Sequence, residues 1–377
     1  MAIACGLASL HAQQAPVTAP RASLQQRLQA KFEELHKAAN FPGGTAAFAM
    51  PDGRVIAIAV GVSDRTAGTP MKPSDRLLLG SVGKTYVSAV ALQLVHEAKF
   101  ALDDPISKYL GAEPWFKRLP NAEKITVRHL MTHTSGLVRY ELNPKFLADL
   151  SANPDKVWSP EDRLAYLFDA TPAFAPGEGW EYSDTNYIVL GMIIERTGKA
   201  PYYDQLSKRI LVPFGLKDTI PVVSREVPGL VQGYAGAQNP FVGTDEMIHN
   251  GKFAVNPQFE WTGGGLAVTA SDLAKWGKLL YEGKVIDPSL MPAFLDGVPA
   301  RLGPETKYGL GVIIRPTPFG ISYGHSGFMP GYQTELLYVP ELKTAIAVQF
   351  NSSARGATGR APLRYALDFA QIVKDGE

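Results

Sequence analysis

The sequence has a single cysteine, Cys5, among its 377 residues. A lone cysteine excludes an internal disulfide framework and any metal site built from several cysteines. The chain also has no uninterrupted apolar stretch of the roughly 20 residues that a membrane-spanning helix needs. No internal repeat or low-complexity tract stands out either.

An excess of charge of either sign is missing as well. The 37 basic and 36 acidic residues leave a net charge of +1, and neither sign forms a long run. A nucleic-acid-binding or membrane-surface protein would carry a basic patch or stripe. We therefore expect no nucleic-acid partner and no stable transmembrane segment. The hydrophobic share of 45% is enough for a large core, in one elaborate domain or two interlocked ones.

The first twelve residues are small and apolar, and they resemble the apolar part and cleavage end of a secretory signal. The positively charged start of such a signal is missing, so a disordered tail is the alternative. We expect residues 1–22 to be a leader and linker, residues 23–377 to form one domain, and the protein to be periplasmic or secreted. Whether Cys5 is lipidated stays open.

Hydrophobic periodicity predicts strands at both ends of the chain and helices between them. Hairpin-linked strands at each end indicate one antiparallel sheet assembled from the two termini. We expect an α+β fold (an α/β sandwich), with the sheet flanked by helices and a mainly helical lobe at roughly residues 100–250. The helices are expected at 24–39, 125–131, 146–171, 187–196, 271–280 and 362–373, and the strands at 45–50, 54–60, 311–315, 334–339 and 344–350.

The stretch Gly80–Thr85 combines a serine and a lysine at the start of a predicted helix. Ser81 and Lys84 are three residues apart, so they lie on one face of that helix. A serine hydroxyl becomes a good nucleophile when a base takes its proton, and a helix start favours an oxyanion. Taken alone, the pair is equally an N-cap serine with a solvated lysine.

Two further stretches carry polar groups suited to the same chemistry. Tyr182 near a cationic lysine would have its phenolate favoured and would then accept a proton from Ser81. Glycines flank His325 and Ser326, which permits close approach of a ligand backbone, and an N–H there would complete an oxyanion hole. Each stretch alone is more simply explained as a surface turn.

The three fragments together resemble the penicillin-recognising serine hydrolases, in the branch of class C β-lactamases, D-alanyl-D-alanine carboxypeptidases and related esterases. The matching motifs are Ser81-x-x-Lys84, Tyr182-x-Asp184 and His325-x-Gly327. Other stretches agree, and they are residues 125–137, 174–177, 308–311 and 323–327. The resemblance covers residues 24–370 and implies a β-lactamase/transpeptidase-like fold.

The resemblance also implies roles for particular residues. Ser81 would be the acylated nucleophile, Lys84 its activator, and Tyr182 the general base or the relay to the leaving group. The backbone N–H groups of Ser81 and Phe328 would form the oxyanion hole. The substrate-binding residues would include His325, Ser326 and Gly327. No cofactor and no metal are implied.

The sequence departs from the family pattern at two places. Asp184 stands where the motif has Asn, and an ionised Asp only accepts hydrogen bonds. It would pair with Lys84 and weaken amide or β-lactam turnover. Ile313 stands where carboxypeptidase relatives carry an arginine for the substrate carboxylate, and Arg315 is the nearest arginine. Because alternate strand residues share a face, the carboxylate clamp is expected to be shifted to Arg315 or absent.

A histidine pair and a tryptophan each have a functional and a structural explanation. His129 and His133 have the spacing of a helical zinc pair, but no His-Glu-x-x-His acid lies between them, so we expect no metal site. Trp261 precedes a glycine run and would line either the substrate pocket or the core.

The sequence therefore predicts a serine hydrolase acting through an acyl-enzyme on Ser81. Its substrate would be a D-amino-acid peptide or a carboxylic ester, with weak β-lactam turnover as a side activity. Two alternatives stay open: a dedicated class C-type β-lactamase, and a non-catalytic protein of the same fold that binds peptidoglycan or a partner.

Overall fold

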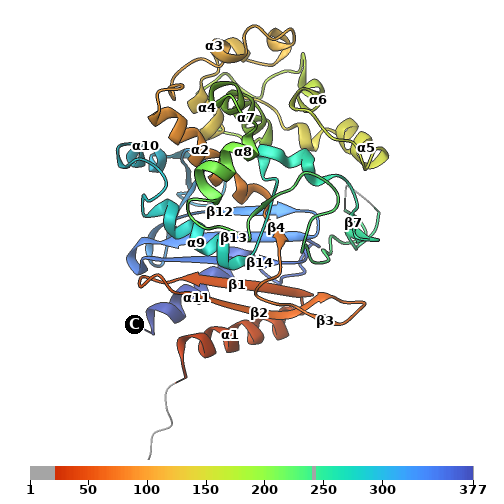
Figure 1. Ribbon diagram of the computed structural model, residues 1–377, viewed down its shortest axis with the longest axis vertical. Coiled ribbons are helices and arrows are strands. Elements are labelled where there is room, and N and C mark those ends of the chain that lie inside the picture. Colours follow the sequence, from red (N-terminus) through yellow and green to blue (C-terminus); the bar gives the residue numbers. More distant parts are fainter. Residues whose placement is uncertain (1–21, 240–242, 377) are drawn as a thin grey trace, which may run out of the picture.

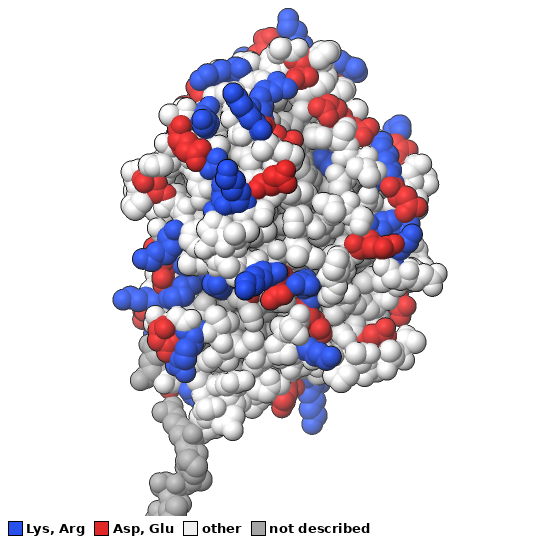
Figure 2. Space-filling view, viewed as in Figure 1, with Lys and Arg blue, Asp and Glu red and all other residues white. Residues whose placement is uncertain are grey.

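The computed structural model describes residues 22–239 and 243–376 (Figure 1). The predicted leader, including Cys5, lies outside the described residues except for its last position. None of the helices in the described ranges is long and apolar enough to cross a bilayer. Figure 2 shows basic and acidic side chains interspersed over one face of the molecule, in keeping with the balanced composition.

A nine-stranded antiparallel sheet runs through the described part of the chain. Its central pairing joins β1 to β14, so strands from the two ends of the chain lie side by side, as the sequence predicted. The α+β fold class is confirmed. The spatial order is β3 (Thr69–Pro70), β2 (Val55–Asp64), β1 (Gly43–Ala49), β14 (Thr344–Phe350), β13 (Tyr332–Val339), β12 (Gly320–Met329), β11 (Ile313–Thr317), β10 (Lys307–Tyr308) and β9 (Val298–Pro299).

Helices cover both faces of this sheet. On one face, α1 (Leu24–Ala39) and α11 (Pro362–Lys374) pack together, and Phe32 meets Phe369 edge to face. On the other face, α9 (Ala270–Tyr281) lies against β1, β13 and β14. Helix α1 begins at a capping box, in which Ser23 and Gln26 exchange hydrogen bonds. The sheet is thus the middle layer of a sandwich, with α1 and α11 on its lower side in Figure 1.

The remaining helices gather beyond the α9 face, at the top of Figure 1. Two of them, α2 and α7, are buried nearly all round, which is the pattern of central core helices. The helices are α2 (Lys84–His96), α3 (Ser107–Leu110), α4 (Val127–Thr132), α5 (Pro144–Ala152), α6 (Pro160–Leu164), α7 (Asp184–Gly198), α8 (Tyr202–Leu206) and α10 (Met291–Leu295).

The helical stretch predicted at residues 146–171, which contains a helix start signal at 159–161, is two helices, and the second begins at Pro160 as that signal indicated. The chain forms α5 and then α6, followed by a short 3-10 turn. Pro154 lies between α5 and α6, and Pro160 is the first residue of α6. Proline cannot donate the backbone hydrogen bond that a continuous helix requires. Small extra strands complete the fold: β4 (Leu77–Leu78), β5 (Ile220–Pro221) and β8 (Leu266–Val268) in one sheet, and β6 (Ile248–His249) with β7 (Lys252–Phe253).

Strand β12 has one partly open edge. Strand β11 pairs with it only as far as Gly324, which lies opposite Ile313. Residues 325–329 pair with β13 alone within the described ranges. The open half of β12 carries the His325-Ser326-Gly327 stretch, so backbone groups there remain available to a ligand.

Candidate active site

Ser81 lies in a tight 3-10 turn, Gly80–Gly83, that joins β4 to α2. Gly80 has a φ of 55°, a conformation that favours glycine. A Cβ at Gly80 would lie 2.5 Å from the carbonyl oxygen of Phe328 and 2.7 Å from its nitrogen. The missing side chain therefore lets β12 approach the turn, which brings the backbone at Ser81 and Phe328 together as an oxyanion hole requires.

A second glycine tightens the same contact from the other side. A Cβ at Gly327 would lie 2.1 Å from the carbonyl oxygen of Leu79. Such a contact is impossible without moving one of the two backbones, so glycine is needed at this position. The turn that carries the nucleophile and the strand that carries the second N–H are fixed against each other by two glycines.

Lys84 has a fully buried side chain beside this turn. Its Nζ donates to Ser81 Oγ at 3.0 Å and to the carbonyl oxygen of Gly263 at 2.6 Å. It also forms an ion pair with Asp184, with Oδ1 at 2.5 Å. An ammonium has three N–H donors, and three oxygens surround this one. The Lys84 ammonium is therefore held in place against the Ser81 hydroxyl.

The charge state of Lys84 follows from burial and from Asp184. Burial is the largest single influence and lowers the pKa of Lys84, but Asp184, with smaller contributions from Tyr182 and Glu260, raises the pKa above its ordinary value. Asp184 is thus placed as the sequence suggested, as a counter-ion for Lys84. The resting lysine is a cation, so it must pass a proton to another group before it accepts one from Ser81.

Tyr182 lies at the same centre, and Lys84 Nζ is 5.0 Å from the centre of its ring. Burial raises the pKa of Tyr182, and the nearby Lys84 and Ser81 counter this only in part. The sequence-based expectation of a favoured phenolate is therefore not met, because burial outweighs the lysine. Within the described part of the chain, the buried hydroxyl lies near Lys84 and Ser81 without a well-aligned hydrogen bond to either. Its proton is free to be given to a ligand.

His133 supports Tyr182 and was not recognised from the sequence as a site residue. Its ring lies 4.2 Å from the ring of Tyr182, centre to centre. Nδ1 lies 3.3 Å from the Ser183 backbone N–H and 3.0 Å from Asn186 Nδ2. Because both of those groups are donors, Nδ1 accepts and Nε2 carries the proton. Burial holds the pKa of His133 well below its usual range, so the ring is neutral.

His325 is also neutral, and both of its ring nitrogens are engaged. Nδ1 lies 2.7 Å from the carbonyl oxygen of Ser326, which can only accept, so Nδ1 carries the proton. Nε2 therefore accepts from the Tyr308 hydroxyl at 2.9 Å. Burial lowers the pKa of His325 to about 3, and the charge of Lys84 adds to this. His325 thus brings no positive charge to the site.

A cleft of about 750 Å³ opens in front of Ser81. Of the predicted site residues, the cleft brings together the following: Ser81, Tyr182, Arg315, His325, Ser326, Gly327 and Phe328. Ile313 lines it too, in keeping with its shared strand face with Arg315. Phe328 is 57% exposed, which leaves its ring at the cleft wall as an apolar contact for a substrate.

Trp261 does not line this cleft. It is buried, its ring meets that of Tyr202 edge to face, and it lies 5.5 Å from the guanidinium of Arg163. A Cβ at Gly191 would lie 2.8 Å from the Trp261 ring. Of the two sequence-based interpretations of Trp261, the core is correct and the pocket wall is wrong.

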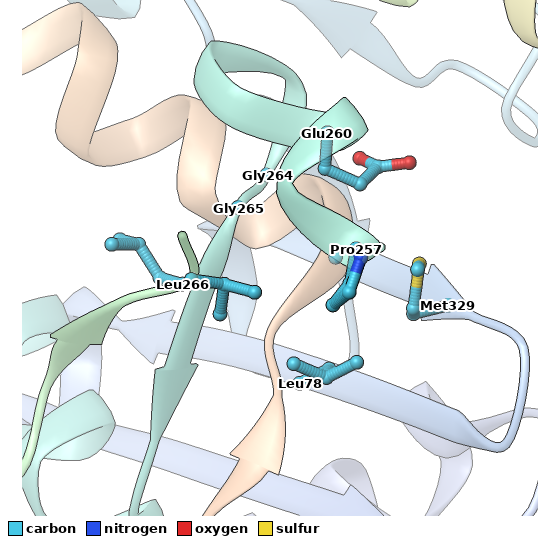
Figure 3. A pocket seen from close by; sticks show the side chains of 9 residues that line it. Leu78, Pro257, Glu260, Gly264, Gly265, Leu266 and Met329 are labelled. Atoms are coloured by element: carbon cyan, nitrogen blue, oxygen red, sulfur yellow. The ribbon is translucent and has the colours of Figure 1, made fainter. Parts of the chain in front are cut away.

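Two buried glutamates, Glu141 and Glu260, lie near Asp184, and the sequence carried no signal for either. Burial raises the pKa of Glu141 to about 7 and that of Glu260 to about 8, and the charge of Asp184 pushes both in the same direction. Glu260 borders a cavity of about 10 Å³ (Figure 3). A cavity of this size holds about one water molecule. Both glutamates therefore sense the charge of Asp184, the counter-ion of Lys84.

His129 and His133, which have the spacing of a zinc pair, contact different parts of the structure. His129 Nδ1 accepts from the backbone N–H of Thr126 in the capping box of α4, whereas His133 packs on Tyr182. In residues 22–239 and 243–376, no group of three or more metal-binding side chains gathers at one place.

Ser81, the buried Lys84 and Tyr182 meet beside the open half of β12. There the Gly80–Gly83 turn packs against that strand. This arrangement and fold define a serine hydrolase. Residues 28–371 match the family described as Beta-lactamase. The chain belongs to that family, which confirms the resemblance to penicillin-recognising serine hydrolases.

Several named proteins are similar to this chain in sequence or in structure. Penicillin-binding protein 4* of Bacillus subtilis is 27% identical over 85% of this chain and 71% of its own length. Esterase EstB of Burkholderia gladioli is 33% identical over 52% of this chain and 51% of its own. A D-stereospecific amidohydrolase from a Streptomyces species has a TM-score of 0.73 at 26% identity, covering 94% of this chain and 97% of that one.

Proposed function

We propose that the chain hydrolyses D-amino-acid peptides or carboxylic esters through an acyl-enzyme on Ser81, with weak β-lactam turnover. The observation that carries this proposal is the Lys84 ammonium, 3.0 Å from Ser81 Oγ at the floor of the cleft. The likeness to a penicillin-binding protein, an esterase and a D-stereospecific amidohydrolase supports the choice of acyl substrates.

In the proposed acylation, the Lys84 proton first passes to Asp184, which leaves a neutral amine and a carboxylic acid. The amine takes the proton of Ser81 as Oγ attacks the carbonyl carbon. The N–H groups of Ser81 and Phe328 stabilise the oxygen anion that forms. When the acyl bond breaks, Tyr182 gives its proton to the leaving group, Lys84 reprotonates Tyr182, and Asp184 returns its proton to Lys84. Ser81 is acylated, the leaving group carries the former Tyr182 proton, and Tyr182 has been resupplied through Lys84, which took the proton of Ser81.

Deacylation repeats these transfers with water in place of Ser81 as the attacking group. Water gives one proton to Lys84, after Asp184 has taken the ammonium proton. The Ser81 oxygen leaves and receives a proton from Tyr182. Lys84 then reprotonates Tyr182 and Asp184 returns its proton to Lys84, which restores the free enzyme. The acid product keeps the water oxygen. Every proton is held by a group on the buried side of the cleft, so no external base is needed.

A non-catalytic binding protein of this fold is the less favoured candidate. A binding surface has no need for a wholly buried lysine, because burying a charge is costly unless it is paired and used. A dedicated β-lactamase is disfavoured by Asp184, whose negative charge replaces an amide that would donate to a substrate carbonyl.

The test is an activity panel on the wild type, Ser81→Ala and Lys84→Ala. The panel contains a short-chain nitrophenyl ester, a chromogenic cephalosporin and a D-alanyl-D-alanine peptide, and a fluorophosphonate probe reports acylation directly. We expect ester or peptide turnover and labelling in the wild type only, with a fall of about 10²–10⁴-fold in Lys84→Ala. An unlabelled wild type that turns over no substrate would favour the binding protein.

A further inference from the structure

Three side chains on neighbouring strands form a closed polar cluster in the wall of the cleft. Arg315 on β11 forms an ion pair with Glu335 on β13, and its Nη2 donates to Ser326 Oγ at 2.8 Å. Ser326 Oγ in turn donates to Glu335 Oε2 at 2.7 Å. Ser326 and Glu335 are directly opposite each other in the β12–β13 pairing. The guanidinium is therefore bound on two sides by groups of this chain.

The cluster is shielded from solvent. The side chain of Arg315 is 11% exposed and that of Glu335 is 1% exposed. Screening by water and salt is weak in such a place, so a single charge of either sign acts strongly on a ligand. Here the two charges cancel. An incoming carboxylate would meet an arginine that already has an anion at contact distance.

The cluster is also close to the reaction centre. Ser326 precedes Phe328, whose N–H belongs to the proposed oxyanion hole, by two residues, or about 7 Å of strand. Arg315, Ser326 and Glu335 all line the same cleft as Ser81. A charge at this distance from the scissile bond would attract or repel a charged end of a short substrate.

We propose that Glu335 cancels the charge of Arg315 and so makes the cleft select substrates that are uncharged beyond the scissile bond, such as esters and aminoacyl amides, over peptides with a free carboxylate. This inference rests on the proposed function and names its substrate class. Glu335 is the specificity-determining residue, and Arg315 becomes a carboxylate clamp only when that acid is removed.

The other arginines of the cleft do not replace the clamp. Arg139 is engaged by Glu141 at 2.6 Å, and its side chain is 33% exposed, so solvent screens its charge more than that of Arg315. Arg364 is exposed on α11 at the rim, where solvent screens its charge. Within the described residues, Arg315 is thus the shielded cleft arginine whose charge can be released by a single substitution on β13.

The experiment compares matched ligands on the wild type, Glu335→Gln and the double variant Arg315→Gln/Glu335→Gln. The ligands are N-acetyl-D-alanyl-D-alanine and its C-terminal amide, assayed for kcat/KM and, on a Ser81→Ala background, for Kd by calorimetry. We expect the wild type to favour the amide. Glu335→Gln should raise the acid-to-amide ratio about 10-fold or more, which is the usual strength of a hydrogen bond to a charged group. The double variant should return to the wild-type ratio.

The acid-to-amide ratio does not depend on the fraction of enzyme that is folded. If Glu335→Gln folds poorly, the double variant still offers a neutral pair of similar shape. Glu113→Gln, which breaks an ion pair with Arg196 away from the cleft, is the control and should leave the ratio unchanged. A wild type that prefers the acid, or a double variant that loses acid binding about 10-fold, would show a working clamp and overturn the inference. Failure of all turnover with the predicted shift in Kd would instead count against the proposed function alone.

Discussion

At the scale of single residues, Asp184 sets this site apart from the family pattern it otherwise follows. It holds Lys84 as a cation by direct contact, and it lies in the position of an amide that would donate to a substrate. Its two effects are separable. One concerns proton transfer, because the proposed mechanism passes a proton between Lys84 and Asp184. The other concerns substrates, because a carboxylate cannot donate to a carbonyl oxygen.

The substitution Asp184→Asn should change both effects. Without the negative charge, the pKa of Lys84 falls, and the amine must lose its proton to solvent before it can accept one from Ser81. We expect kcat/KM to acquire an ascending basic limb that the wild type lacks. We also expect cephalosporin turnover to rise relative to ester turnover, by about 10-fold if the new amide donates one hydrogen bond to the substrate. Stopped assays from pH 5 to 10 measure both.

Asp169→Asn is the control for this experiment, since it removes only a solvent-exposed ion pair with Arg118. It should leave the pH profile and the substrate ratio as they are. If Asp184→Asn gave an unchanged cephalosporin-to-ester ratio, the idea that Asp184 limits amide and β-lactam turnover would be wrong. An unchanged pH profile would remove Asp184 from the proton route.

The sequence predicted the residues whose roles rest on a motif, and it missed those whose roles rest on distant contacts. Ser81, Lys84 and Tyr182 were identified because their spacing matches a family, and the pairing of Asp184 with Lys84 followed from charge. Glu335 was missed because its partner Arg315 is 20 positions away on a strand that is not adjacent to its own. The neutral Tyr182 was missed because burial, which raised its pKa, depends on the whole fold.

At the scale of elements, the site depends on the close fit between the Gly80–Gly83 turn and β12. The sequence indicated a turn and a strand start but not that they touch, because the contact joins segments far apart in the chain. It also ran one helical stretch across Pro154, where local periodicity outweighed the proline. Strand β12 itself was predicted only as the start of a hairpin.

The substitution Gly327→Ala should therefore damage catalysis more than folding. Its Cβ would meet the Leu79 carbonyl oxygen at 2.1 Å, so β12 must move away from the turn and take the Phe328 N–H with it. Loss of one oxyanion-hole donor typically costs about 10²–10³-fold in kcat. We expect a loss of that size for the ester substrate with KM changed much less, measured in steady-state kinetics.

Gly243→Ala is the matched control, because a Cβ there would meet no atom within 4 Å. It should leave kcat unchanged. A Gly327→Ala enzyme with wild-type kcat and a normal thermal unfolding midpoint would show that the turn does not need β12 for catalysis.

At the scale of the whole molecule, we expect the buried glutamates near Asp184 to make stability depend on pH. Burial raises the pKa of Glu260 to about 8, with a further contribution from Asp184, whereas an unfolded glutamate has a pKa of about 4.3. Between these values the folded protein binds a proton that the unfolded chain has released. The stabilisation is complete below the unfolded value and is lost as pH rises through the folded value.

The substitution Glu260→Gln should flatten this dependence, because glutamine stays neutral at every pH. In urea unfolding, we expect the free energy of unfolding of the wild type to fall from pH 5 to pH 8 more steeply than that of the variant, by up to about 1.4 kcal/mol per pH unit for one proton. Some slope should remain, since burial also raises the pKa of Glu141. Glu123→Gln, an exposed acid, should match the wild type. Parallel curves for the wild type and Glu260→Gln would mean that Glu260 is ionised in the folded protein, and Lys84 would then be balanced by two charges.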